Sequence, residues 1–238
     1  MSRLKSLEIN FPDGWFGCPF KIHWTGTLFL IALACVSLIF LAFGVALYIS
    51  VMIHELAHAI VAKKLGYKID GIILHVLGGG TLIKKFIVRE GPSPGDEFKI
   101  CFAGPIASIA LGLCALAYFI PTQSSTGFYI VHYVAFFGFL NLFLAIYNLF
   151  PVWPLDGGRI LHAFANYHLK DNLKSINICT IMGLLFGLTM IIVGIWLYGL
   201  GWIIIGAFCI LWAISAYGAT RASFELQLDE NSNTRERV

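Results

Sequence analysis

The stretch that decides the fold is residues 45–65, VALYISVMIHELAHAIVAKKL, a helix-length apolar run that contains His54, Glu55 and His58. About 20 apolar residues cross the hydrocarbon of a bilayer as a helix. Residues four apart share a helix face, so the two imidazoles lie on the same side. An ionisable residue at membrane depth costs about 2.5–3.5 kcal/mol on insertion scales and by default indicates function. The stretch therefore predicts a chemically active membrane helix rather than a packing pair of histidines.

Two histidines at this spacing suit one Zn²⁺, and the glutamate beside the first suits a general base. Lys63 and Lys64 mark the cytoplasmic end of the helix. A rise of about 1.5 Å per residue places His54 roughly 13 Å, and His58 roughly 7 Å, from that end. The sequence therefore predicts a metal site inside the hydrocarbon, nearer the cytoplasm.

A catalytic zinc takes three protein ligands and one water, so a third ligand is needed. The best candidate is Asp156, in the segment NLFPVWPLDGGR at residues 148–159. Pro151 and Pro154 interrupt a helix there, and irregular backbone at membrane depth persists only where protein or a water-filled cavity covers it. The alternative reading is a turn that begins a helix, because Asp before two glycines is common in turns. The need of the histidine pair for a partner favours the ligand.

Composition excludes a soluble enzyme, a disordered chain and a collagen-like fibre. Of the 238 residues, 58% are apolar and 12% are charged, against about 45–50% and about 25% in soluble domains. The net charge of +3 is weak, and we expect no nucleic-acid partner. The six cysteines form no C-x-x-C pair, so we expect neither a disulfide framework nor a cysteine metal site. The chain is predicted to be a polytopic membrane protein.

The predicted fold class is an all-α polytopic membrane protein of about six transmembrane helices, with a membrane-associated β-hairpin between the second and the third. Residues 1–24 form a cytoplasmic or interfacial arm, 25–220 the membrane domain, and 221–238 a polar cytoplasmic tail. The predicted spans are residues 25–42, 45–65, 98–120, 129–149, 176–197 and 200–217. A tight turn at Gly44 separates the first two.

Charge fixes the expected topology. The turns near residues 43–44, 121–128 and 198–201 contain no Lys, Arg, Asp or Glu, and all 16 Lys and Arg fall in the other connections and the terminal segments. Cytoplasmic loops are enriched in Lys and Arg. With six spans, both termini are therefore expected on the cytoplasmic side of a plasma or inner membrane.

Residues 66–90 predict the hairpin. Two strand-like runs, YKIDGIILHVL (67–77) and TLIKKFIVRE (81–90), flank the glycines 78–80. An exposed strand edge can pair with an extended substrate by β-addition. The alternative is a hairpin that only orients the helices, since edge strands are often structural.

HELAH in a membrane helix, then Ala103-Gly104-Pro105, then N-x-x-P-x-x-P-L-D-G-G, resembles the site-2 protease family of intramembrane zinc metalloproteases, in its compact branch without PDZ or CBS domains. The resemblance covers roughly residues 24–159. It implies one Zn²⁺ per chain on His54, His58 and Asp156, with Glu55 as the catalytic base. It further implies that substrate is bound by Asn148 and its neighbour Pro151, and by the hairpin glycines Gly79 and Gly80.

The function expected from this resemblance is zinc-dependent endoproteolysis inside the membrane, with single-span membrane proteins as substrates and the lipid bilayer as surroundings. One alternative is a metal transporter, which also uses intramembrane His and Asp; it needs a polar path across the whole bilayer, and the outer halves of these spans carry no charge. Another is a relative that binds membrane helices without cleaving them. The sequence leaves the substrate, its gating and the oligomeric state open.

Overall fold

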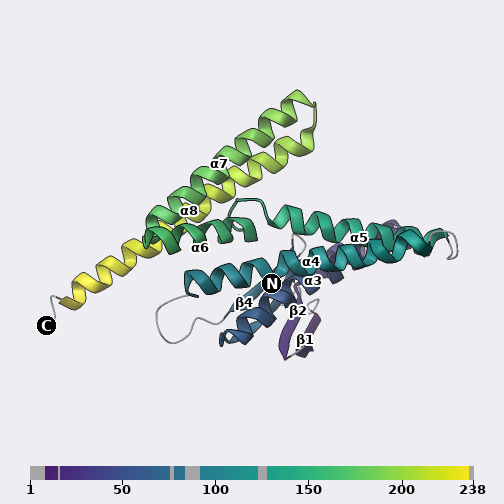
Figure 1. Ribbon diagram of the computed structural model, residues 1–238, viewed down its shortest axis with the longest axis horizontal. Coiled ribbons are helices and arrows are strands. Elements are labelled where there is room, and N and C mark those ends of the chain that lie inside the picture. Colours follow the sequence, from purple (N-terminus) through teal and green to yellow (C-terminus); the bar gives the residue numbers. More distant parts are fainter. Residues whose placement is uncertain (1–8, 16, 76–77, 84–91, 123–127, 236–238) are drawn as a thin grey trace. The chain divides into compact units, whose positions relative to one another are not determined.

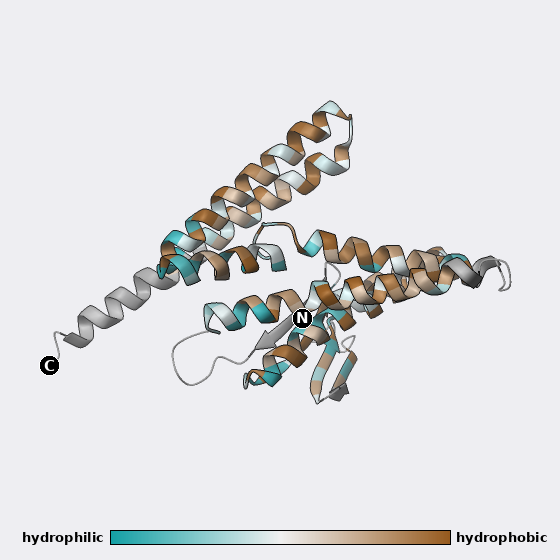
Figure 2. Cartoon of the chain, viewed as in Figure 1, coloured by the Kyte–Doolittle hydropathy of each residue, from teal (hydrophilic) through white to brown (hydrophobic). Residues whose placement is uncertain are grey.

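The computed structural model describes residues 9–15, 17–75, 78–83, 92–122 and 128–235. The chain divides into two compact units, Met1–Asn148 and Leu149–Val238, which we treat separately. Across the described residues, five helices are long and apolar enough to cross a membrane. Figure 2 shows the apolar residues that dominate these helices. The predicted fold class, a helical polytopic membrane protein with a small sheet, is confirmed.

The first unit begins with two strands and two helices (Figure 1). They are β1 (Ile9–Trp15), β2 (Cys18–Ile22), α2 (Trp24–Val36) and α3 (Leu38–Lys64). The break between the helices lies at Ser37, not at Gly44 as the sequence suggested. The Ser37 hydroxyl accepts hydrogen bonds from the backbone N–H groups of Ile39 and Phe40 and so caps α3.

Gly44 lies inside α3, where a Cβ would collide with Leu33 of α2. This glycine therefore serves close helix packing and not a turn. With its end at Val36, α2 has 13 residues, about 20 Å of helix, which is shorter than the roughly 30 Å of hydrocarbon that a full span crosses.

A hairpin follows α3, as the sequence predicted. Strands β3 (Ile69–His75) and β4 (Gly78–Ile83) pair antiparallel. The glycines expected in the turn instead lie in β4, where Gly79 pairs with Leu74 and Gly80 with Ile73. Residues 76–77 and 84–91, which include the rest of the predicted second run, lie outside the described residues.

The N-terminal arm was not expected to contain strands, yet β1 and β2 extend the hairpin into a four-stranded sheet of order β1-β2-β3-β4. β2 runs parallel to β3, with Phe20 opposite Ile72. Gly17 makes the tight connection between β1 and β2 with a φ of +68°, which glycine adopts without strain.

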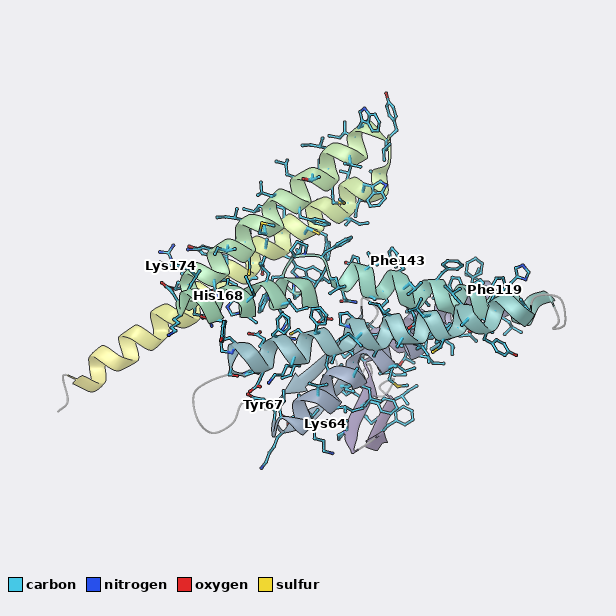
Figure 3. The ribbon with its side chains drawn as sticks, viewed as in Figure 1. Lys64, Tyr67, Phe119, Phe143, His168 and Lys174 are labelled. Atoms are coloured by element: carbon cyan, nitrogen blue, oxygen red, sulfur yellow. The ribbon has the colours of Figure 1, made fainter. Side chains whose placement is uncertain are left out.

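The core of the first unit lies between this sheet and α3. Ile72 and Leu74 of β3 pack with Leu56 and Ala59 of α3, and all four are buried. At the end of α3, Tyr67 donates a hydrogen bond to Asp96 of the next helix at 3.1 Å; Figure 3 labels Tyr67 beside Lys64. The sheet is thus held against the half of α3 that carries the histidine pair.

Two long helices complete the first unit, α4 (Pro94–Thr122) and α5 (Phe128–Asn148). They run side by side (Figure 1). Gly112 and Gly138 allow their close approach, because a Cβ on Gly112 would lie 2.9 Å from the carbonyl oxygen of Gly138.

The second unit contains α6 (Asp156–Leu169), α7 (Asn172–Trp196) and α8 (Leu200–Arg235). Figure 3 labels His168 and Lys174, on either side of the α6–α7 connection. α7 and α8 form an antiparallel pair in which a Cβ on Gly187 would lie 2.7 Å from the carbonyl oxygen of Gly206. The helix α8 continues through most of the stretch that the sequence suggested as a polar tail.

Candidate metal centre

The side chains of the two histidines of α3 meet beside Gly104 of α4. Their imidazole rings lie edge to face with centroids 4.8 Å apart, and both side chains are buried. A Cβ added to Gly104 of α4 would lie closer than 3.0 Å to Nε2 of His54 and to Nε2 of His58. Only a glycine fits there, so the A-G-P motif provides the surface over which the two Nε2 atoms meet.

The opposite ring nitrogens are both hydrogen-bonded. Nδ1 of His54 lies 2.9 Å from the hydroxyl of Ser108, and Nδ1 of His58 lies 2.6 Å from the carbonyl oxygen of Ile100. A carbonyl only accepts, so Nδ1 of His58 donates and its Nε2 carries a lone pair.

This arrangement fits a metal ion. Metal-bound histidines almost always donate their second ring N–H to a neighbouring acceptor, which fixes the tautomer and the ring orientation. Here both hydrogen-bond partners of the Nδ1 atoms come from α4. The ligand atoms that His54 and His58 offer lie within 4.8 Å of one another. The chain thus holds two nitrogen donors ready for a borderline-soft ion such as Zn²⁺.

Glu55 lies next to the first histidine and against the hairpin. A Cβ on Gly79 of β4 would lie 2.7 Å from Cγ of Glu55 and 2.9 Å from the side chain of Val51. The absence of a side chain at Gly79 therefore lets the β4 backbone pass directly over Glu55. Of the two predicted hairpin glycines, Gly79 touches the predicted base, and Gly80 follows it along the same strand.

Asp156 is the first residue of α6 and is buried, with 7% of its surface exposed. The two glycines that follow it allow the chain to fold tightly. A Cβ on Gly157 would collide with the carbonyl groups of Leu149 and Phe150, and one on Gly158 would lie 2.5 Å from the backbone of Trp153. The Pro-rich segment therefore folds back onto the first turn of α6, and this determines where its carboxylate sits in the second unit.

The two remaining predicted substrate residues border that segment. Asn148 is the last residue of α5 and donates from Nδ2 to the carbonyl oxygen of Leu144 at 2.9 Å. Pro151 lies in the segment that precedes α6 and is half-buried. Contacts of either residue with a substrate stay a prediction.

The sequence is similar to one protein family and to several known relatives. A model of peptidase family M50 matches residues 42–126 and 122–190. The chain belongs to peptidase family M50. It is 36% identical over 188 residues to a zinc metalloprotease of Methanocaldococcus jannaschii, covering 75% of this chain and 52% of that protein. It is 30% identical over 179 residues to stage IV sporulation protein FB of Bacillus subtilis, covering 71% and 58%. The chain therefore spans about half the length of the curated relatives it matches.

A solved structure, the site-2 protease from Methanocaldococcus jannaschii, has the same fold with a TM-score of 0.61 and 28% identity. The alignment covers 88% of this chain and 95% of that one. The predicted resemblance to the site-2 protease family is thus confirmed. The zinc metalloprotease relatives also make zinc the metal to consider for the histidine pair.

The sequence did not reveal the residues that hold the two histidines, Ser108 and Ile100. Ser108 lies four residues after Gly104 of the A-G-P motif and therefore on the same face of α4. A serine in an apolar helix one turn from that glycine was the available signal. The hydrogen bond to the backbone carbonyl of Ile100 could not be predicted from the sequence, because every residue has the same carbonyl group.

A second pair of histidines lies at one end of the sheet, with His23 directly after β2 and His75 as the last residue of β3. The rings of His23 and His75 have centroids 4.6 Å apart. Burial lowers the pKa of His75 below its ordinary value, and the neighbouring His23 and Lys21 lower it further. His23 itself caps α2, accepting a hydrogen bond from the N–H of Thr25. His23 therefore caps a helix, whereas both Nδ1 atoms of His54 and His58 are hydrogen-bonded to α4.

Proposed function

We propose that the chain is a zinc-dependent endopeptidase that cleaves the membrane segments of single-span proteins. The observation that carries the proposal is the convergence of two buried Nε2 atoms over Gly104, with both Nδ1 positions engaged, on an apolar helix that also bears Glu55. Membership of family M50 supports the peptide bond as the substrate group.

We propose His54, His58 and Asp156 as the three protein ligands. The histidines offer neutral nitrogen donors, and a carboxylate completes a donor set that is common at catalytic zinc and leaves one position for water. The chemistry and burial of Asp156 support this role, because zinc accepts carboxylate oxygens as ligands and the side chain is shielded from bulk water. A Zn²⁺ held by these residues would supply a water of lowered pKa and would polarise the scissile carbonyl.

Glu55 carries the proton in this proposal. Its carboxylate accepts a proton from the attacking water and delivers it to the amine nitrogen of the leaving peptide, so that the residue returns to its starting state. Its neighbour His54 is fixed through Ser108, and the helix backbone fixes the distance between the two side chains. The β4 backbone at Gly79 lies close to Cγ of Glu55.

We propose that the hairpin binds the substrate as an extended segment. A membrane helix hides its peptide bonds in internal hydrogen bonds, so a protease needs an extended segment. β4 is the terminal strand in the order β1-β2-β3-β4 and passes over Glu55. A substrate strand added to that edge by backbone pairing would lie beside the base. Asn148 is proposed to hold the substrate backbone through its side-chain amide.

We further propose that the protein resides in a plasma or inner membrane with both termini cytoplasmic. This topology needs six crossings, so we propose that the short apolar helix α2 crosses together with the five longer helices. The supporting observation is the charge pattern: Lys63 and Lys64 are exposed at the end of α3, and the connections at the other ends of the helices carry no charge. Labelling of a cysteine placed near either terminus in sealed vesicles tests this orientation.

The deciding experiment compares wild type, Glu55→Gln and the control Glu97→Gln on a single-span substrate in proteoliposomes. We expect cleavage by wild type and by the Glu97 variant, and none above background by Glu55→Gln with zinc still bound. Wild-type cleavage rates in Glu55→Gln would refute the mechanism. Zinc uptake that depends on His54 would support a transporter instead, and bound zinc without turnover on any substrate would support a helix-binding relative.

A further inference from the structure

Two hydrogen bonds join α3 to α5, and both show the same register. The hydroxyl of Tyr133 donates to the carbonyl oxygen of Ala42 at 2.7 Å. Eight residues further along both helices, Nδ2 of Asn141 donates to the hydroxyl of Ser50 at 2.9 Å. Each pair is separated by 91 residues in sequence. The helices therefore run parallel and keep one register over about 12 Å.

The inner pair is polar and completely buried, with 0% of Ser50 and of Asn141 exposed. Ser50 donates its hydroxyl hydrogen to the carbonyl of Ala46, so its oxygen is free to accept from Asn141. Asn141 also donates to the carbonyl of Phe137. Within the part of the chain that the structure describes, its amide oxygen has no hydrogen-bond partner.

Burying an amide with an unpaired oxygen in apolar surroundings opposes stability, while interhelical hydrogen bonds in membranes contribute little to it on average. Net stability is thus a weak reason for an asparagine here. A single buried polar residue is best attested as a device that fixes the register of packed helices.

The register can be extended toward the site. Asn148 lies seven residues after Asn141, and Ala57 lies seven residues after Ser50. Seven residues are close to two helical turns, about 10.5 Å, so both stay on the faces that already meet. The same offset of 91 places Asn148 level with Ala57, in the turn of α3 that ends at His58. The same offset places Ala145 level with His54, and both residues are buried.

We infer that Asn141 is a positioning residue that, through Ser50, fixes the depth and rotation at which Asn148 meets the histidine-bearing turn of α3. Without this hydrogen bond α5 can rotate or slide, and Asn148 leaves that level. The inference deepens the proposed function and rests on it for the part that Asn148 plays with substrate.

The first test needs no cleavage. In a chain with the exposed Cys35 and Cys114 replaced by serine, we place cysteines at Ala57 and Asn148 and apply a short bifunctional maleimide. We expect cross-linking for this pair and not for the control pair at Ala57 and Ile146, since Ile146 is 59% exposed. Adding Asn141→Leu should lower the cross-linked fraction at least about fivefold, since the pair shares one hydrogen-bonded register. An unchanged fraction would overturn the inference.

The second test separates positioning from general stability. Asn141→Leu should lower kcat/KM about tenfold when residue 148 is Asn and less than about twofold in an Asn148→Ala background, since residues that act as a unit are non-additive. Bound zinc should not change. The matched control is Phe143→Leu, on the same helix but 66% exposed and on its outer side in Figure 3; it should leave kcat/KM unchanged.

An equal loss in both backgrounds would show a purely structural role and overturn the inference. Failure of the wild-type chain to cleave any substrate would refute the proposed function instead, and the cross-linking result would then decide the register on its own.

Discussion

Replacing Gly104 by alanine adds one methyl group at the point where the two imidazoles meet, while leaving every proposed ligand in place. The added Cβ would lie 2.6 Å from Nε2 of His54 and closer still to Nε2 of His58. Ordinary contacts begin at 3.4 Å, so Nε2 of His54 must retreat by at least 3.4 − 2.6 = 0.8 Å. Metal–ligand distances tolerate only about 0.2 Å.

The expected result follows from that displacement. Disturbing the support of a metal ligand typically lowers affinity about 10–100-fold, and misplacing a reacting group by about 1 Å can lower the rate about 100-fold. We expect Gly104→Ala to weaken zinc binding at least about tenfold and to lower kcat/KM about 100-fold. The ratio of zinc to protein is measured after dialysis against a graded series of chelator concentrations.

The matched control is Gly95→Ala, in the first turn of the same helix, where a Cβ would meet nothing within 4 Å. Both substitutions exchange glycine for alanine in α4, so their effects on helix propensity are comparable, about 1 kcal/mol in favour of alanine. Zinc affinity within about twofold of wild type in Gly104→Ala, in a folded protein, would refute the described convergence of Nε2 atoms.

Three further outcomes are expected. Ser108→Ala removes the partner of Nδ1 on His54, and zinc affinity measured by chelator competition should fall about 10–100-fold; an unchanged affinity would contradict the role of Ser108. Gly187→Leu should destabilise the α7–α8 pair, because even a Cβ would press on the backbone of α8, whereas Gly201→Leu, with open space around it, should not; thermal unfolding in detergent compares them, and equal unfolding temperatures would refute this packing. The pKa of His75 is lower in the folded chain than in the unfolded chain, so the unfolded chain takes up a proton first as pH falls. This contribution to the stability of the sheet is fully present above about pH 6.5. It is lost as pH falls from there through the lower pKa of the folded chain. Hydrogen exchange of β3 at pH 7.5 and pH 5.5 checks the sign. The control is His75→Gln, in which the loss of protection at the lower pH should be smaller than in wild type; stronger wild-type protection at the lower pH would contradict the prediction.

Much of the fold was predictable, because long apolar runs have few alternatives. Helices α4, α5, α7 and α8 follow from runs that match the thickness of a bilayer, and the hairpin follows from β-branched residues around glycines. The histidine pair was predictable for the same local reason, since its spacing alone places both rings on one helix face.

What the sequence did not reveal depends on contacts between distant segments. Gly44 suggested a turn, but it lies inside α3, where the lack of a side chain leaves room for Leu33 of α2. The break between the two helices lies at Ser37, which caps α3. The short strand β2 contains Pro19 and has weak intrinsic preference; pairing with β3 stabilises it. The pairing of Asn141 with Ser50 also needs the packing of α5 on α3, which no local pattern encodes.

X-ray absorption at the zinc edge of the purified wild-type protein tests whether the two histidines bind zinc. We expect one zinc per chain with two imidazole nitrogens at about 2.0–2.1 Å, further oxygen ligands at about 2.0–2.2 Å and no sulfur. We also expect loss of the zinc in His54→Ala. A sulfur shell near 2.3 Å, or a spectrum with fewer than two imidazoles, would contradict zinc binding by His54 and His58.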